Sequence, residues 1–348
     1  MRILVLHAYS ATNAGDGLLV EETIELLREA FSECDITIAA LHPNTFNLPG
    51  INLLDASPKL KGFSPELRKA LNSLSSFDLV VGVGGGYIRA GHPVEALKMI
   101  AAHGYQLVKA SRAKVPVAYL PQSIGPLRFG SLPLAKHFLS RMNKVYLRDD
   151  RSIHELKLAN AVRIQDLATM TGTFVTRQDV SVASKPVLSV RSVRGRISDP
   201  VKALAARFGS FDGYVQSRGA GNDDTSAMAS LGPDRTLSKE ELLGSTGQRR
   251  VVVAVRLHAA LMAINAGHWV VHLAYERKGF GAFDDLGLSD HVFNVNSFDV
   301  DKVQALIQGL LTDPERRLDY DRRLGDSRSG AAAARTQLIG DIQDLAKL

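Results

Sequence analysis

The most informative stretch of this chain is Val251-Val252-Val253-Ala254-Val255-Arg256-Leu257-His258-Ala259-Ala260-Leu261. The valines predict a buried strand, and the alanines and leucines that follow predict a helix. In an α/β domain such a junction places side chains at the carboxyl edge of the sheet, where these domains bind ligands. Arg256 offers a donor fork for a carboxylate or phosphate, and His258 can exchange a proton near neutral pH. The pair suggests an enzyme acting on an anionic substrate, although a helix cap beside a solvated charge would also fit.

Composition indicates an ordinary globular protein with two domains. The chain has 348 residues, of which 45% are hydrophobic and 22% charged, and this length exceeds that of one typical core. A single cysteine, Cys34, excludes an intramolecular disulfide. No HxH, HExxH or cysteine pair suggests a metal site, so we expect no metal and no cofactor. The first residues predict a strand rather than a signal peptide, and we expect a cytoplasmic location.

The net charge of +6 is moderate, and the positive residues look dispersed rather than gathered in a nucleic-acid-binding arm. We therefore expect no nucleic-acid partner. The excess fits anionic substrates or an anionic membrane surface, and a merely basic soluble protein fits equally well.

Strand and helix patterns alternate along the chain. In the first half we expect strands at 3–7, 36–41, 78–83, 115–120 and 144–147, and helices at 17–31, 93–111, 132–142 and 151–158. In the second half we expect strands at 187–191, 212–216, 251–255, 269–274 and 292–295, and helices at 200–208, 257–266, 300–311, 313–324 and 331–348. This alternation predicts the α/β class, with parallel sheets covered on both faces.

A polar, irregular segment at 171–185 separates the two series and ends before Pro186. We therefore expect an N-terminal Rossmann-like domain at 1–175, a C-terminal one at 186–330 and a final helix at 331–348. By analogy with the GT-B glycosyltransferase architecture, the domains would face each other across a cleft, with the final helix packing back on the first. The segment 217–247 is rich in Gly, Asp, Ser and Thr, which suggests a mobile lid.

Three loops of the first half follow predicted strands and carry candidate ligand-binding groups. The first contains Asn13 and Asp16 and opens a helix, whose N-terminus attracts anions; helix capping is the structural alternative. The second is Gly84-Gly85-Gly86, where the backbone can approach a ligand or form a tight turn. The third begins at Gln122.

The second half supplies further polar groups at the ends of predicted strands. Arg191 ends the strand after the linker and would share a sheet edge with Arg256, which is the pattern of a two-arginine anion clamp. Tyr275 and Lys278 follow the strand at 269–274.

Taken in order, these motifs resemble the polysaccharide pyruvyl transferase family over about residues 3–288. The matching features are the Asn-x-Gly-Asp loop at 13–16, the glycines at 84–86, the Pro-Gln-x-x-Gly-Pro segment at 121–126, the Arg-Asp pair at 148–149 with Ser152, and the block from Arg256-Leu257-His258 to Tyr275 and Lys278.

The resemblance implies a ketal pyruvyltransferase in exopolysaccharide biosynthesis. Such an enzyme takes phosphoenolpyruvate and places its pyruvate group across two hydroxyls of a sugar. The C-terminal domain would hold phosphoenolpyruvate and the N-terminal domain a sugar or lipid-linked oligosaccharide acceptor at the inner membrane surface. His258 is the expected general acid or base, and Asp16 a weaker candidate for activating a hydroxyl.

Two alternatives remain open. A GT-B glycosyltransferase would use a nucleotide sugar in the same architecture and release a nucleoside diphosphate. A non-catalytic binder of an anionic sugar or nucleotide would show affinity without turnover. The sequence does not identify the acceptor sugar, the bridged hydroxyls or the oligomeric state.

Overall fold

The computed structural model describes the chain except for residues 61, 171–180, 194, 219–222 and 245–247. The chain forms two compact units. Unit 1 comprises Met1–Ala11, Asp16–Met170 and Ala333–Leu348, and unit 2 comprises Thr12–Gly15 and Thr171–Ala332. Most of the predicted linker at 171–185 lies outside the described residues.

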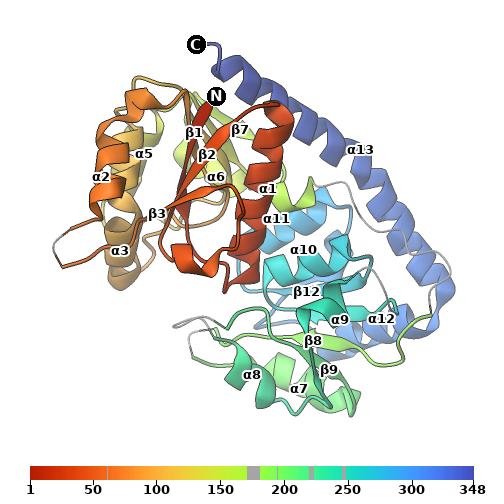
Figure 1. The fold of residues 1–348 in the computed structure, drawn as a ribbon. Helices are drawn as coiled ribbons and strands as arrows, with labels where there is room; N and C mark the ends of the chain where they lie inside the picture. The colour runs from red at the N-terminus through yellow and green to blue at the C-terminus, as the bar shows by residue number, and fades with distance from the viewer. Residues whose placement is uncertain (61, 171–180, 194, 219–222, 245–247) are drawn as a thin grey trace. The chain divides into compact units, whose positions relative to one another are not determined.

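Unit 1 is built on a parallel seven-stranded sheet in the order β3-β2-β1-β4-β5-β6-β7. Its strands are β1 Arg2–Ala8, β2 Asp35–Ala40, β3 Asn52–Asp55, β4 Leu79–Gly82, β5 Val117–Gln122, β6 Lys144–Leu147 and β7 Ala161–Arg163. The apolar runs of β1, β4 and β5 are buried, because helices cover both faces of the sheet (Figure 1).

The helices of unit 1 form a layer on each face of this sheet (Figure 1). They are α1 Ala14–Ala30, α2 Pro65–Asn72, α3 Pro93–Met99, α4 Tyr105–Ala110, α5 Ser131–Leu139 and α6 Asp150–Leu156, with short turns η1 Pro43–Thr45, η2 Leu74–Ser76, η4 Leu167–Thr169 and the π-helical turn η3 Ile100–Gly104. Leu67, Leu107 and Leu139, from α2, α4 and α5, belong to one apolar cluster with the sheet. The end of the last helix lies beside α1 on the other face, where Gln343 donates to the carbonyl of Ala30 at 2.8 Å.

A buried carboxyl lies between α1 and the end of the chain. Glu22 is 5% exposed, and its Oε2 lies 3.6 Å from Nη1 of Arg335. Arg335 also forms a two-point ion pair with Glu29, through Nε at 2.9 Å and Nη2 at 2.7 Å. Burial, together with nearby carboxylates such as Glu25, raises the pKa of Glu22 to about 7 despite the opposing effect of Arg335.

This carboxyl makes the stability of unit 1 depend on pH. A carboxyl whose pKa is higher in the folded than in the unfolded state costs stability as the pH rises through its folded pKa, here about 7. We expect Glu22→Gln to raise the free energy of unfolding by about 2 kcal/mol at pH 8 and to change it little near pH 5. Chemical denaturation at both pH values measures this difference. The neighbouring exposed Glu21→Gln is the control, and equal effects of the two variants at pH 8 would refute the assignment.

Unit 2 contains a parallel six-stranded sheet in the order β10-β9-β8-β11-β12-β13. Its strands are β8 Val187–Ser189, β9 Asp212–Tyr214, β10 Thr236–Leu237, β11 Val251–Ala254, β12 Trp269–Ala274 and β13 Val292–Asn294. Its helices are α7 Asp199–Phe208, α8 Thr225–Ala229, α9 Lys239–Leu243, α10 Leu257–Asn265, α11 Arg277–Asp285, the turn η5 Ser289–His291, α12 Val300–Thr312 and the first part of α13 Pro314–Leu345. Both sheets therefore have the alternating strand and helix order of a Rossmann-like domain.

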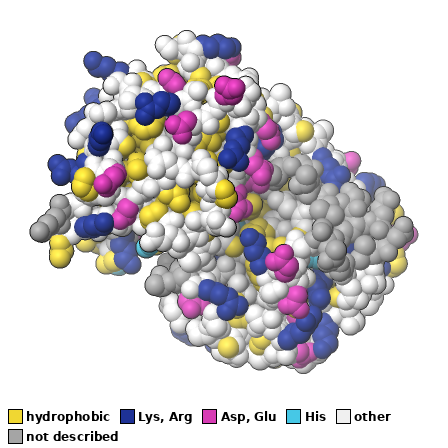
Figure 2. All heavy atoms as spheres, viewed as in Figure 1, with side chains coloured by type: hydrophobic (Ala, Val, Ile, Leu, Met, Phe, Trp, Pro, Cys, Tyr) yellow, Lys and Arg dark blue, Asp and Glu magenta, His cyan; other side chains and the backbone are white. Residues whose placement is uncertain are grey.

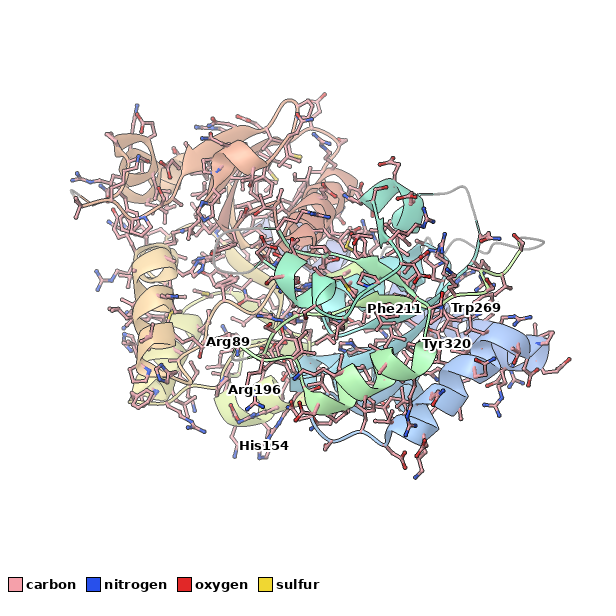
Figure 3. All side chains as sticks on the ribbon, turned by 90° about the horizontal axis from the view of Figure 1, so that it is seen from below. Arg89, His154, Arg196, Phe211, Trp269 and Tyr320 are labelled. Atoms are coloured by element: carbon pink, nitrogen blue, oxygen red, sulfur yellow. The ribbon has the colours of Figure 1, made fainter. Side chains whose placement is uncertain are left out.

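The start of α13 is anchored near the amino ends of β11 and β12. Asp321 accepts two bonds of 2.7 Å from Arg249 and one of 3.1 Å from the indole of Trp269. The Arg249 guanidinium lies 3.7 Å from the ring centre of Trp269. Tyr320 accepts at 3.1 Å from the backbone N–H of Val270, the residue that follows Trp269 (both aromatic residues are labelled in Figure 3). These contacts fix the first turns of α13 within unit 2.

Two predicted features differ in the structure. The helices expected at 313–324 and 331–348 are one helix of 32 residues. Gly325 and Gly330, which lie between the two predicted helices, are part of this helix. The segment 217–247 is not one irregular loop: its described part holds α8, β10 and α9, which bury Met228, Leu237 and Leu242. Residues 219–222 and 245–247 of the predicted lid lie outside the described residues.

Among the described residues, no helix is long and apolar enough to cross a membrane.

Candidate active site

The strand order of unit 2 creates a topological switch point between β8 and β11. From β8 the chain proceeds to β9 and β10 on one side, and it later returns to β11 on the other. Parallel α/β sheets bind ligands outside the carboxyl ends of their strands at such a point. Arg191 follows β8 and Arg256 follows β11, and the two strands are in register at Ser189 and Ala254. Both arginines therefore leave neighbouring strands at the same edge of the sheet.

Arg256 forms a buried ion pair with Asp224, a residue that precedes α8. Its Nη2 donates to Oδ1 at 2.8 Å, and its Nε donates to Oδ2. Burial raises the pKa of the Asp224 carboxyl, and the charges of Arg256 and Arg191 oppose that rise. The pair therefore fixes the direction of the Arg256 guanidinium and ties the segment before α8 to the end of β11.

Arg191 is half-buried and points toward Tyr275, which follows β12. Its Nη1 donates to the Tyr275 hydroxyl at 2.9 Å, and its guanidinium lies 5.0 Å from the ring centre. Because the charge of Arg191 also acts on the Asp224 carboxyl, the two arginines share one electrostatic neighbourhood. The Tyr275 phenol carries no charge, so this contact differs from the ion pair that Arg256 forms with Asp224.

Lys278 lies in the first turn of α11, close to Tyr275 in sequence. Its Nζ lies 2.9 Å from Oε2 of Glu276, and both side chains are about one-fifth exposed. This lysine adds a third cation after the carboxyl ends of the strands, with a carboxylate already beside it. The net charge of the charged groups named so far is +1, from the cations Arg191, Arg256 and Lys278 and the anions Asp224 and Glu276.

His258 is the second residue of α10 and is half-buried. Its ring lies against the backbone of Gly15, since a Cβ on Gly15 would stand 2.4 Å from the His258 Nδ1. Any larger residue at position 15 would have to displace the imidazole. The glycine of the Asn-x-Gly-Asp loop is thus required by the position of His258.

Asn13 shapes the same loop. Its Oδ1 accepts at 3.1 Å from the N–H of Gly15, and its backbone forms a bridge with Ser217. Ser217 is fully buried beside Gln216. The Ser217 Oγ and the Gln216 Oε1 are buried and lack a hydrogen-bond partner among the described residues. The loop at Thr12–Gly15 therefore belongs to unit 2, although it lies between strands of unit 1 in the sequence.

The sheet of unit 1 has its own switch point between β1 and β4, and the glycine loop follows β4. A Cβ on Gly84 would come within 3.0 Å of the Pro121 carbonyl, and Gly85 accepts from the N–H of Ser123 at 2.8 Å. Gly85 has φ +149°, a conformation that favours glycine. These glycines thus let the loop after β4 run against the end of β5, and their contact with a ligand stays a prediction. Asp16 lies in the first turn of α1.

Gln122 is fully buried and belongs to a polar cluster that the sequence analysis did not identify. It donates to the Tyr87 hydroxyl at 2.8 Å, and the ring of His7 stacks on Tyr87 at 4.7 Å. The His7 Nε2 lies 2.6 Å from the Tyr119 hydroxyl, and its Nδ1 lies 3.3 Å from that of His103. Burial lowers the pKa of His103 to about 4. The sequence signal for this cluster is a histidine, His7, within the apolar strand β1.

The structure therefore divides the predicted residues between the two units. Unit 2 holds Asn13, Arg191, Arg256, His258, Tyr275 and Lys278, whereas unit 1 holds Asp16, Gly84, Gly85, Gly86 and Gln122. In unit 2 the arrangement offers two guanidinium groups, a phenol and an imidazole near neighbouring strand ends. Such a set can bind an anion and move a proton.

Comparison with known proteins is consistent with this chemistry. Residues 13–277 match the family model described as polysaccharide pyruvyl transferase. The chain is 23% identical to the amylovoran biosynthesis protein AmsJ of Erwinia amylovora, over 94% of this chain and 97% of that protein.

Solved structures with the same fold include sugar-nucleotide enzymes. The UDP-GlcNAc 2-epimerase of Neisseria meningitidis, bound to UDP-GlcNAc, superposes with a TM-score of 0.55 at 13% identity, over 98% of this chain and 99% of that one. The spinosyn forosaminyltransferase SpnP does so with a TM-score of 0.56 at 11% identity, over all of both chains. At these identities the likeness concerns the fold, which is the two-domain GT-B type.

Proposed function

The chain belongs to the polysaccharide pyruvyl transferase family, and we propose that it transfers a pyruvate group from phosphoenolpyruvate to two hydroxyls of a sugar. The product is a pyruvate ketal in the precursor of a cell-surface or extracellular polysaccharide. The observation that carries this proposal is the placement of Arg191, Arg256 and His258 after the ends of two hydrogen-bonded parallel strands at a switch point.

At C2 of the donor, the reaction forms two C–O bonds, breaks one C–O bond and removes the C=C double bond. The two sugar oxygens bond to C2 of the donor, and the bond from C2 to the phosphate oxygen breaks. Of the two hydroxyl protons, one ends on the donor methylene, which becomes a methyl group, and the other leaves with the phosphate. The enzyme must therefore hold a donor with two anionic groups and carry protons between the acceptor and the donor.

Unit 2 supplies the groups for the donor in this proposal. Phosphoenolpyruvate carries a carboxylate and a phosphate, so Arg191 and Arg256 are the minimal clamp, and Lys278 and the Tyr275 hydroxyl add further donors. Positive charge fixed in advance stabilises the departing phosphate. His258 exchanges the proton, and Gly15 fixes the position of its ring.

The acceptor is assigned to groups of the N-terminal region. Asn13 and Asp16 lie on the loop and the helix start after β1, and Asp16 would activate a hydroxyl. The backbone of Gly84, Gly85 and Gly86 would line the sugar site. Gln122, which donates to the Tyr87 hydroxyl, would help to orient the sugar. We propose that the acceptor is a sugar or lipid-linked oligosaccharide, used in the cytoplasm at the inner membrane.

The test is to incubate the protein with phosphoenolpyruvate and a panel of sugar acceptors. Release of inorganic phosphate, together with an acceptor mass increased by pyruvic acid less one water, is the expected result. Release of a nucleoside diphosphate from a sugar nucleotide would instead identify a glycosyltransferase. Tight binding of either donor without any product would identify a binding protein.

Arg191 tests the donor assignment, because its guanidinium lies beside Tyr275 after the carboxyl end of β8. We expect Arg191→Ala to weaken phosphoenolpyruvate binding by about 1–3 kcal/mol, the range for hydrogen bonds to charged groups. Calorimetry on the folded variant measures this change. Tyr275→Phe is the matched control: it keeps the ring under the guanidinium and removes one hydroxyl, so its effect should be smaller. Donor affinity unchanged in Arg191→Ala would remove this residue from the clamp.

A further inference from the structure

In one helical stretch of unit 1, the second half packs into the core and the first half does not. The helical turns α3, η3 and α4 run without interruption from Pro93 to Ala110. The α4 part buries Gln106, Leu107 and Ala110, whereas no residue of α3 is buried. The first half of this helix therefore contributes little to the stability of unit 1.

The first half nevertheless carries large apolar side chains on its outer surface. Val94 is 54% exposed, Leu97 69% and Ile100 53%. Residues three positions apart lie on the same helix face, so the three side chains form one stripe. A contiguous exposed apolar stripe is unusual for a monomeric protein and marks an interaction surface.

Exposed apolar side chains also lie near the start of α5. The segments before α3 and α5 run side by side, since Ala90 donates to Pro126 at 2.8 Å and accepts from Arg128 at 3.0 Å. Phe129 follows, 67% exposed, with a backbone φ of +56° that costs energy for a bulky residue. A phenylalanine is thus exposed in a strained turn beside these paired segments, and Leu134 in α5 is also 50% exposed.

Positive charge is concentrated in the same part of the chain. Residues 57–144 hold thirteen Lys and Arg but only three Asp and Glu, a net charge of +10, whereas the rest of the chain has a net charge of −4. The positive residues are therefore not evenly dispersed, contrary to the sequence analysis. The carboxylate of Glu95, the acidic residue of α3, is already paired with Arg89 at 3.0 Å and with the N–H of Gly91 at 2.8 Å. The left part of Figure 2, where unit 1 is seen, shows yellow and dark blue side chains together with some magenta ones.

We propose that this surface docks on a bilayer that contains anionic phospholipids. The docking surface consists of Val94, Leu97, Ile100, Phe129 and Leu134, flanked by the exposed Lys98 and Arg128. Protein interfaces are depleted of lysine in their cores, whereas peripheral membrane helices combine inserted apolar side chains with lysine and arginine at the headgroups. The inference extends the proposed function, since it would bring the enzyme to a lipid-linked acceptor.

Co-sedimentation of the full chain with vesicles tests this proposal. The protein should bind vesicles of phosphatidylcholine mixed with phosphatidylglycerol more strongly than vesicles of phosphatidylcholine alone, and added salt should weaken the binding. Leu97→Glu/Phe129→Glu should weaken partitioning at least about tenfold. Lys98→Ala/Arg128→Ala should weaken it about fivefold for each charge removed.

The matched control is Leu318→Glu, because Leu318 is 64% exposed in the part of α13 that belongs to unit 2. It should bind the mixed vesicles like the unaltered protein. Equal binding by Leu318→Glu and Leu97→Glu/Phe129→Glu would overturn the proposal, as would absence of binding to the mixed vesicles. A dimer that the double glutamate variant dissociates, without any vesicle binding, would show that a second copy of the chain covers the surface.

The vesicle assay contains neither phosphoenolpyruvate nor an acceptor, so it does not depend on pyruvyl transfer. If the docking proposal is correct and the proposed function is not, vesicle binding persists without ketal formation. If the proposed function is correct and the docking proposal is not, ketal forms on a water-soluble acceptor and the protein does not bind the vesicles.

Discussion

Replacing His258 with alanine is expected to lower turnover by about 10²–10⁴-fold, the usual share of general acid–base catalysis. His258 is the second residue of α10, close after the end of β11, where an imidazole can reach a ligand held at the strand ends. Arg191 and Arg256 remain in this variant, so donor affinity should change little. The two measurements are turnover at saturating substrate and calorimetric titration with phosphoenolpyruvate.

Gly15→Ala tests the same imidazole without removing it. Its Cβ would stand 2.4 Å from the His258 Nδ1, so the ring must move or the loop must shift. Turnover should fall, again with donor affinity largely kept. Gly17→Ala is the matched control, because its Cβ would meet only ordinary contacts, the nearest at 3.4 Å from Ala11.

Near-normal turnover in a folded His258→Ala variant would show that this histidine has no chemical role. The proton carrier would then have to be sought elsewhere, beginning with Asp16. Loss of turnover in both glycine variants would indicate that the loop, rather than the ring of His258, is sensitive to substitution.

Buried parallel strands were the part of the fold that the sequence predicted well. The strand expected at 251–255 is β11 Val251–Ala254, and the one expected at 3–7 is β1 Arg2–Ala8. Strands covered on both faces need continuous apolar runs, so their signal is strong. The edge strand β3 Asn52–Asp55 was missed, since it is short and none of its residues is buried.

The segment 217–247 shows why composition misleads in short elements. Its abundant Gly, Ser and Asp suggested a loop, but a few apolar residues such as Met228 and Leu242 are enough to hold short helices. One local signal was available. Ser238 and Glu241 form a capping box at the start of α9, and a Ser followed three residues later by Glu is a known helix-start pattern.

The candidate site was predictable in its residue types but not in its contacts. That Arg191 and Arg256 follow strands can be inferred from periodicity, whereas the adjacency of β8 and β11 depends on strand order, which local patterns do not specify. The pairing of Arg256 with Asp224, 32 positions away, depends on the same tertiary arrangement. Asp224 was therefore missed as the partner of the most informative arginine.

This ion pair leads to the second large expected effect. Arg256→Ala should lower the free energy of unfolding by about 3–5 kcal/mol, because it leaves the buried carboxylate of Asp224 without its partner. The Asp224 side chain is only 4% exposed, so solvent cannot replace the guanidinium. Loss of donor binding in this variant alone would therefore not separate a binding role from a structural one.

The double variant Arg256→Ala/Asp224→Ala separates them. Removing both charges avoids the unpaired carboxylate and should recover much of the lost stability, as measured by chemical denaturation in a double-mutant cycle. If Arg256 holds the donor, the stable double variant should still bind phosphoenolpyruvate more weakly by about 1–3 kcal/mol. If the arginine serves only to tie the segment before α8 to β11, donor affinity should return together with stability. The single variant Asp224→Ala completes the cycle. It removes the carboxylate that pairs with Arg256, so the local positive charge rises. Donor affinity should then increase only if the Arg256 guanidinium faces the bound anion.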